Sequence, residues 1–217
     1  MPSSARRLRP AESVPPVLAV ALFVPLFVFR RIGPLDFWWW MAANVVILTV
    51  SGAALDGGYL TALRRDLSEN ILRKIGLGIL SAGLLYGIFF IGGHAMRVLS
   101  PSGGTDIARI YGFKSGLSPL RIVLLMVFLI GPGEELFWRA YLQRLWMERF
   151  GRFKGPLAAV ALYTLVHIAG GNPVLVLAAA VCGLFWGVLY LRSQSALLVA
   201  VSHTVWDAAI FVLLPLA

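Results

Sequence analysis

Residues 122–146 read IVLLMVFLIGPGEELFWRAYLQRLW, a stretch apolar enough to cross a membrane that nevertheless holds charges in its second half. A helix of about 20 apolar residues spans the hydrocarbon core of a bilayer. Glu134, Glu135 and Arg139 interrupt this one. Because a charge at the bilayer centre costs about 2.5–3.5 kcal/mol, such residues are kept where they pair with one another or carry out chemistry. The stretch therefore predicts a transmembrane helix with a polar site in it.

The composition of the whole chain also indicates a membrane protein. Of its 217 residues, 59% are hydrophobic and 13% charged, and the mean hydropathy is +0.82. Soluble proteins are about 45–50% apolar and about 25% charged, and disordered chains lack this much apolar surface. The formal net charge of +9 then indicates basic loops beside anionic lipid, with no nucleic-acid partner. We expect an integral membrane protein whose first partner is the lipid bilayer.

Apolar segments on both sides of this stretch complete a predicted all-α, polytopic transmembrane helix bundle. About seven spans are expected, the first of them uncleaved: Pro16–Phe29, Phe37–Leu55, Ile75–Met96, Ile122–Trp146, Pro156–Ala169, Pro173–Leu191 and Ala196–Leu216. The charged segment Thr61–Lys74 has apolar residues at helical spacing, which predicts an interfacial amphipathic helix. Residues 97–120, rich in Gly, Ser and Pro, are expected to be the longest polar connection. We predict one integral membrane domain over residues 1–217.

The basic residues predict the orientation, because Lys and Arg accumulate in cytoplasmic loops. The larger share falls on one side of the predicted spans: Arg6, Arg7, Arg9, Arg64, Arg65, Arg73, Lys74, Arg144, Arg149, Arg152, Lys154 and Arg192. This distribution predicts the N-terminus inside and the C-terminus outside, in the cytoplasmic membrane of a bacterium or archaeon.

Six ionisable residues lie inside the predicted spans: Glu134, Glu135, Arg139, His167, His203 and Asp207. Glu135 and Arg139 are four residues apart, as are His203 and Asp207, so each pair shares a helical face. Counted at 1.5 Å per residue from the basic loops, the groups on three spans lie at one depth, about 16–22 Å from the cytoplasmic boundary. A buried polar network that only holds helices together is the structural alternative, but a common depth favours a site.

The tripeptide Gly131-Pro132-Gly133 comes directly before the first carboxylate. Proline removes a backbone hydrogen bond, so we expect a kink or break there. Backbone groups freed at this depth must face protein or water. The tripeptide thus predicts a water-accessible cavity beside Glu134.

These residue types suit hydrolysis of a peptide bond. Glu134 is the candidate general base on water, and His167 is placed to share or relay the proton. His203 is the candidate donor to the oxyanion. Three further residues complete the hypothesis: Asp207 orients His203 or donates a hydrogen bond itself, Glu135 pairs with Arg139 to fix the helix that carries Glu134, and Tyr163, four residues before His167, offers a phenol.

A zinc site is the chemical alternative, because two His and one Glu form a known catalytic zinc set. Its ligands would be Glu134, His167 and His203. The HExxH pattern, a stronger zinc signal, is absent from the sequence.

Three motifs in this order resemble those of the CPBP group, the CAAX-protease and bacteriocin-processing (Abi) membrane family. Glu134-Glu135-Leu-Phe-Trp-Arg139 resembles EExxxR, and Tyr163-Thr-Leu-Val-His167 resembles FxxxH with Tyr for Phe. His203-Thr-Val-Trp-Asp207 resembles HxxxB, in which B is Asn or Asp. The resemblance covers residues 120–210, which we take as a CPBP-like catalytic core.

The resemblance implies an intramembrane endopeptidase similar to CAAX prenyl protease 2, acting on a membrane protein or peptide. Glu134 and His167 would activate the water, and His203 and Asp207 would form the oxyanion site. It favours glutamate-dependent catalysis with no cofactor, and zinc stays open. The first alternative function is a non-catalytic bacteriocin-immunity or scaffold member of the same family. A small transporter is the second, and the missing inverted repeat counts against it.

Overall fold

The computed structural model describes residues 14–216 and is an all-α bundle, as predicted. The first half of the chain forms α1 Val14–Phe29, β1 Arg31–Ile32, β2 Leu35–Asp36, α2 Phe37–Leu55, α3 Gly57–Asp66, α4 Ile71–Leu99, α5 Gly103–Tyr111 and the 3₁₀ turn η2 Gly112–Lys114. The second half forms α6 Pro119–Leu125, η3 Met126–Ile130, α7 Gly131–Glu135, η4 Leu136–Gln143, α8 Arg144–Phe150, α9 Lys154–Ile168, α10 Pro173–Ser193, α11 Ala196–Ala208 and η5 Ala209–Leu213. The expected basic residues Arg6, Arg7 and Arg9 lie outside the described residues.

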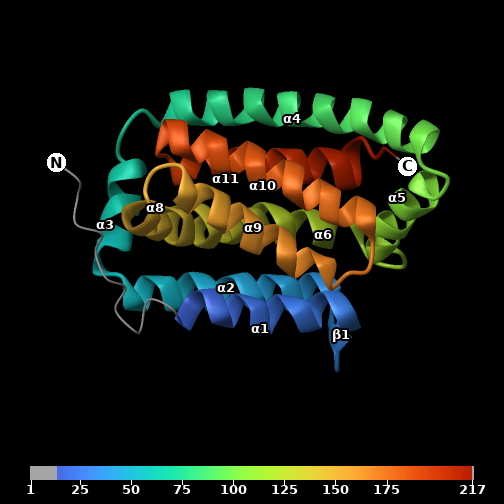
Figure 1. Ribbon diagram of the computed structural model, residues 1–217, viewed down its shortest axis with the longest axis horizontal. Coiled ribbons are helices and arrows are strands. Elements are labelled where there is room, and N and C mark those ends of the chain that lie inside the picture. The colour runs from blue at the N-terminus through green and yellow to red at the C-terminus, as the bar shows by residue number, and fades with distance from the viewer. Residues whose placement is uncertain (1–13, 217) are drawn as a thin grey trace.

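The helices run side by side in layers, and the motif-bearing helices form the middle of the bundle (Figure 1). The antiparallel pair α1 and α2 covers one side, and α4 covers the other by packing along α11. Between them lie α6 to α11, in which α9 packs against α8 and α10 and α11 packs against α7. We call the two ends of the bundle the α3 end, where α3 and α8 lie, and the α5 end, where α5 and the β1–β2 hairpin lie.

The expected membrane segments are all helical, though not all of them have the length of a full span. Within residues 14–216, four helices are long and apolar enough to cross a membrane: α2, α4, α10 and α11 with η5. A fifth span is obtained if the continuous helix from α6 to α8 is counted together with α5 and η2, from which it is bent by 89°. The helices α1 and α9 are apolar but shorter.

Two expectations about the connections need correction. The segment Thr61–Lys74 is not one helix, because α3 ends at Asp66 and Asn70 takes a left-handed conformation with φ of 52° before α4 begins. Residues 97–120 are not a simple loop, because they contain α5. This helix buries Ile107 and Asp106, exposes Arg109, and lies nearly perpendicular to the helix that follows.

The kink expected at Gly131-Pro132-Gly133 is replaced by π-helical turns on both sides of α7. The helix continues from Pro119 to Phe150, with η3 and η4 in π geometry. The Gly131 N–H donates to the Met126 carbonyl, five residues back, so the chain has already left α-helical register where Pro132 has no N–H to give. A Cβ at Gly131 would lie 2.6 Å from Thr204 Oγ1, so glycine there permits α7 to pack closely on α11.

Candidate active site

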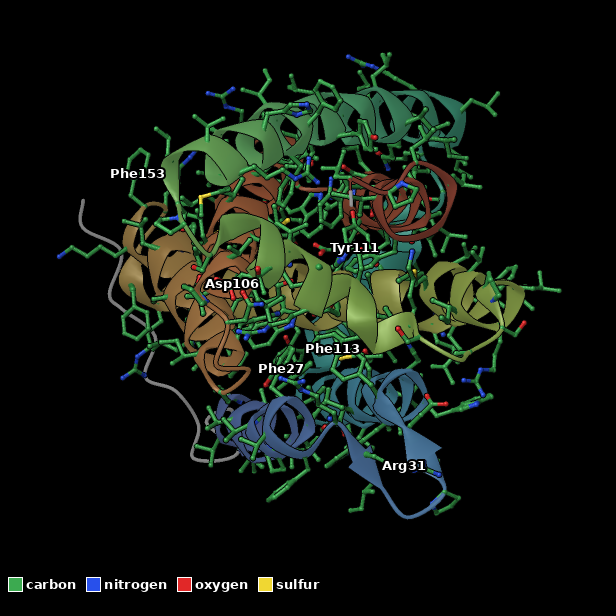
Figure 2. All side chains as sticks on the ribbon, turned by 90° about the vertical axis from the view of Figure 1, so that its right-hand side faces the viewer. Phe27, Arg31, Asp106, Tyr111, Phe113 and Phe153 are labelled. Atoms are coloured by element: carbon green, nitrogen blue, oxygen red, sulfur yellow. The ribbon has the colours of Figure 1, made fainter. Side chains whose placement is uncertain are left out.

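A cavity of about 420 Å³ lies in the half of the bundle nearer the α5 end. Its wall is almost entirely apolar. Figure 2 views the molecule from this end, with Tyr111 and Phe113 in front of the bundle and Phe27 below them, and all three line the cavity. The same wall includes four ionisable side chains, all buried: Glu134, His167, His203 and Asp207. The four residues expected to carry the chemistry thus come together from α7, α9 and α11.

Glu135 is the centre of a buried ion network behind this wall. Its Oε1 accepts one hydrogen bond from Arg139 Nη1 at 2.8 Å and another from His203 Nδ1 at 2.7 Å. The first contact is the pair that the four-residue spacing predicts. The second was missed, because no local pattern relates residues 68 positions apart. A carboxylate paired with arginine only accepts hydrogen bonds, so Nδ1 of His203 carries the proton.

The other ring nitrogen of His203 faces two carboxylates. Nε2 lies 3.5 Å from Asp207 Oδ2 and 3.7 Å from Glu134 Oε2. Sequence reasoning allowed Asp207 to orient His203, but Glu135 orients the ring at Nδ1, and Asp207 stands on the Nε2 side. Glu134 Oε1 is buried and has no hydrogen-bond partner within the described part of the chain. Both separations exceed an ordinary hydrogen-bond length, so Nε2 is near both carboxylates without a close hydrogen bond to either.

His167 reaches the cavity from the last turn of α9. Its Nδ1 lies 2.7 Å from the Tyr163 carbonyl, which only accepts hydrogen bonds, so Nδ1 carries the proton and Nε2 is left as an acceptor. The ring packs against Phe27 at a centroid distance of 4.6 Å. Within residues 14–216 no hydrogen bond joins His167 to Glu134, so the two side chains share the cavity wall without a direct hydrogen bond.

Tyr163 supports the site through its ring. The Arg139 guanidinium carbon lies 5.0 Å from the Tyr163 ring centroid, and the His167 ring lies 4.7 Å from it on the neighbouring turn. Tyr163 therefore links the ion network to His167 by packing, a role that the Phe of the FxxxH pattern would fill equally well.

Comparison with known protein families agrees with this arrangement. Residues 116–209 match the family model Rce1-like, described as Type II CAAX prenyl endopeptidase Rce1-like. This match makes residues 116–209 similar to the CAAX-protease (CPBP) family, and we call them the CAAX-protease region. The matched region runs from the turn before α6 to the first residue of η5 and includes all three motifs. No curated protein and no solved structure matches the chain.

The zinc alternative needs Glu134, His167 and His203 to converge on one point. Among residues 14–216, no group of three His, Cys, Asp or Glu side chains has the arrangement that would hold a metal ion. The three candidate ligands share the cavity wall without converging, so we derive no step through a metal.

Proposed function

We propose that the protein is an intramembrane endopeptidase that hydrolyses a peptide bond of a membrane-associated protein or peptide with a carboxylate-activated water. One observation supports this most strongly: Glu134, His167, His203 and Asp207 line a single cavity that is otherwise apolar, inside the CAAX-protease region. A buried network that only held helices together would have its carboxylates paired. Within residues 14–216, Glu134 Oε1 has no hydrogen-bond partner and lies beside a space large enough for water, whereas Glu135, whose Oε2 is also unpartnered, does not line the cavity.

The proposed reaction begins at Glu134. Its carboxylate takes a proton from a water molecule whose other hydrogen bond goes to Nε2 of His167, and the water oxygen attacks the carbonyl carbon of the scissile bond. Negative charge develops on the carbonyl oxygen near Nε2 of His203. In this step the His203 ring is an imidazolium, whose Nδ1 keeps its bond to Glu135 while Nε2–H donates to the oxygen, with Asp207 adjacent. The C–N bond then breaks, and the proton held by Glu134 passes to the leaving amine.

The apolar wall supports a substrate with a hydrophobic segment or a lipid group next to the cut. We propose residues 120–210 as the catalytic core of a single integral membrane domain, with the N-terminus inside and the C-terminus outside. The non-catalytic immunity or scaffold role has no separate observation in its favour and becomes an outcome of the test.

The test compares purified Glu134→Gln and His167→Ala with the wild type. Each protein in detergent micelles receives a farnesylated CAAX peptide, the same peptide without the lipid, and a proteome-derived peptide library, with products identified by mass spectrometry. We expect both variants to lose cleavage by at least about 100-fold, since each removes a group that handles the proton. Glu69→Gln is the matched control, because Glu69 is exposed and, among the residues that the structure describes, forms its ion pair with Arg65. Cleavage by Glu134→Gln at the wild-type rate would contradict the proposal and favour a non-catalytic role.

Metal removal separates the two chemistries. Because the base on water is a side chain, we expect cleavage to be unchanged after incubation with 1,10-phenanthroline or EDTA and dialysis. Loss of activity that returns on addition of Zn²⁺ would replace the glutamate mechanism with a zinc mechanism.

A further inference from the structure

Trp186 on α10 contacts the candidate oxyanion donor, His203. Its ring stacks on the imidazole of His203 with centroids 3.7 Å apart and planes 22° from parallel. Trp186 has 0% exposed surface, and it also forms part of the cavity wall. No motif in the sequence singled it out, because it lies in an apolar run between the second and third motifs.

The stacking supplies a constraint that the hydrogen bond to Glu135 lacks. A single hydrogen bond at Nδ1 fixes one edge of the imidazole but leaves the ring free to swing and tilt about that edge. A flat contact with a buried indole fixes the plane of the ring. Together the two contacts determine where Nε2 points, which is toward Glu134 Oε2 and Asp207 Oδ2.

A chain of hydroxyl groups holds the indole in its own place. Trp186 Nε1 donates to Ser202 Oγ at 3.2 Å, and Ser202 Oγ lies 2.9 Å from Ser81 Oγ. Ser81 has one hydroxyl proton, which it donates to the Gly78 carbonyl at 2.8 Å. Ser202 is therefore the donor to Ser81 and accepts from Trp186. These hydrogen bonds connect α10, α11 and α4, and the Ser202 hydroxyl both accepts and donates one.

The same indole contacts the ion network. The Arg139 guanidinium carbon lies 5.5 Å from the Trp186 ring centroid, while Arg139 pairs with Glu135. Trp186 thus touches the histidine and the arginine that share one carboxylate, and it is anchored to the residue that directly precedes the histidine.

We infer that Trp186 is a positioning residue for the reaction, which holds the His203 imidazole so that Nε2 is presented to the cavity. The inference rests on the proposed endopeptidase function for its kinetic consequence, but its structural claim is independent of that function. Ser202, adjacent to the histidine, serves as the anchor of Trp186.

The kinetic test is a pair of substitutions at Trp186 with a control in the same cavity. Trp186→Leu removes the stacking ring, and we expect kcat to fall about 10- to 100-fold, since a misplacement near 1 Å has a cost of that order. KM should stay within about threefold. Trp186→Phe keeps a flat ring and should restore kcat to within about threefold of the wild type. Trp38→Leu removes another buried indole from the cavity wall, one that packs on Phe37 and Phe211, and should keep more kcat than Trp186→Leu.

Two kinetic results would overturn the inference. One is a Trp186→Leu variant whose KM rises while kcat is kept, which would make Trp186 a substrate contact. The other is a Trp186→Phe variant as impaired as Trp186→Leu, which would show that the ring contact is not what matters.

A spectroscopic test does not depend on cleavage. The chain has only three histidines, so NMR of protein labelled in the histidine rings gives three sets of signals, assigned with His203→Gln. We expect the indole face to shift the His203 ring protons upfield in the wild type. The upfield shift should be smaller in Trp186→Phe, and the signals should move downfield in Trp186→Leu. Ser202→Ala, which keeps the ring but removes its anchor, should move them in the same direction by less. His203 signals unchanged in Trp186→Leu would overturn the inference whether or not the protein cleaves a substrate.

Discussion

Glu135 binds two other ionisable side chains through one carboxylate oxygen inside the helix bundle. A single oxygen accepts hydrogen bonds from Arg139 on its own helix and from His203 on α11, and the other oxygen is buried without a partner in the described residues. The three side chains are almost completely buried. In such a site the charges stabilise one another, and removing one of them leaves an uncompensated charge in a medium of low dielectric constant.

We therefore expect Arg139→Met to destabilise the protein by about 3–5 kcal/mol. The free energy of unfolding is measurable by SDS titration followed by circular dichroism. Arg65→Met is the matched control, because the pair of Arg65 with Glu69 is exposed, with 81% and 58% of the side-chain surfaces accessible, and should contribute less than about 1 kcal/mol. Equal losses in both variants would contradict the network described here.

At the scale of single residues, the sequence predicted contacts between residues one helical turn apart and missed contacts between residues far apart in the chain. Helical periodicity places Arg139 one turn from Glu135, and this contact is present. The contact of Glu135 with His203 and the stacking of Trp186 depend on how α7, α10 and α11 pack, which no residue spacing encodes. Asp207 illustrates the limit: it lies one turn from His203, but on the side of Nε2.

At the scale of elements, α4 is held to the bundle by its close approach to α11. A Cβ added to Gly78 would lie 2.8 Å from Val201 Cβ and 2.9 Å from the Leu198 carbonyl oxygen. Backbone atoms of α11 cannot withdraw from such a contact without moving the helix, so a larger residue at this position separates the two helices.

Gly78→Ala should therefore cost about 1–3 kcal/mol of stability, the usual effect of overpacking. Gly83→Ala on the same helix has no atom within 4 Å of the added Cβ, so it should be neutral or slightly stabilising. Thermal unfolding of both proteins in the same detergent measures the difference. A Gly78→Ala protein as stable as Gly83→Ala would show that α4 is loosely attached.

Element boundaries were predicted where hydropathy changes sharply and missed where backbone geometry decides. The second span, Phe37–Leu55, agrees with α2 residue for residue. The third was expected to begin at Ile75, but α4 begins at Ile71, since the left-handed Asn70 ends the preceding turn and Lys74 pairs with Asp66. The break expected at Pro132 is instead a change of helical register. The π-helical turn before Pro132 lets the helix continue although Pro132 has no N–H to donate.

At the scale of the whole molecule, the two ends of the bundle differ in Lys and Arg content. Within the described residues, the α3 end carries the basic residues of α3, the start of α4, α8, the start of α9 and the end of α10. The α5 end has fewer, and most of them bind the protein itself: Arg121 pairs with Asp36, Arg109 with Asp106, and Lys114 donates to the Phe211 carbonyl.

The positive-inside rule then predicts that the α3 end faces the cytoplasm. Cysteine accessibility checks this, in a Cys182→Ser protein with one new thiol at each end. Ser115→Cys, beside η2, should react with a membrane-impermeant maleimide in intact spheroplasts. Ser68→Cys, beside α3, should react only in inverted vesicles. The opposite pattern would invert the proposed topology.

Sequence alone predicted the bundle and a cavity beside Glu134 but not which helices form the cavity wall. The cavity wall draws on α1, α2, α4, α5, α7, α9, α10 and α11, so its shape depends on the arrangement of most of the chain.

The position of the cavity along the bundle also determines how a cut would divide a substrate. His167 is the next-to-last residue of α9, and α5 lies across the same end of the bundle. A membrane-spanning substrate severed at this level would be divided unequally. One fragment would keep most of the apolar length and remain anchored, while the other would retain a stub of few apolar residues. The free energy that holds such a stub in lipid is small, because it grows with each buried methylene. The proposed cut would therefore release one product and leave the other in the membrane without any further machinery.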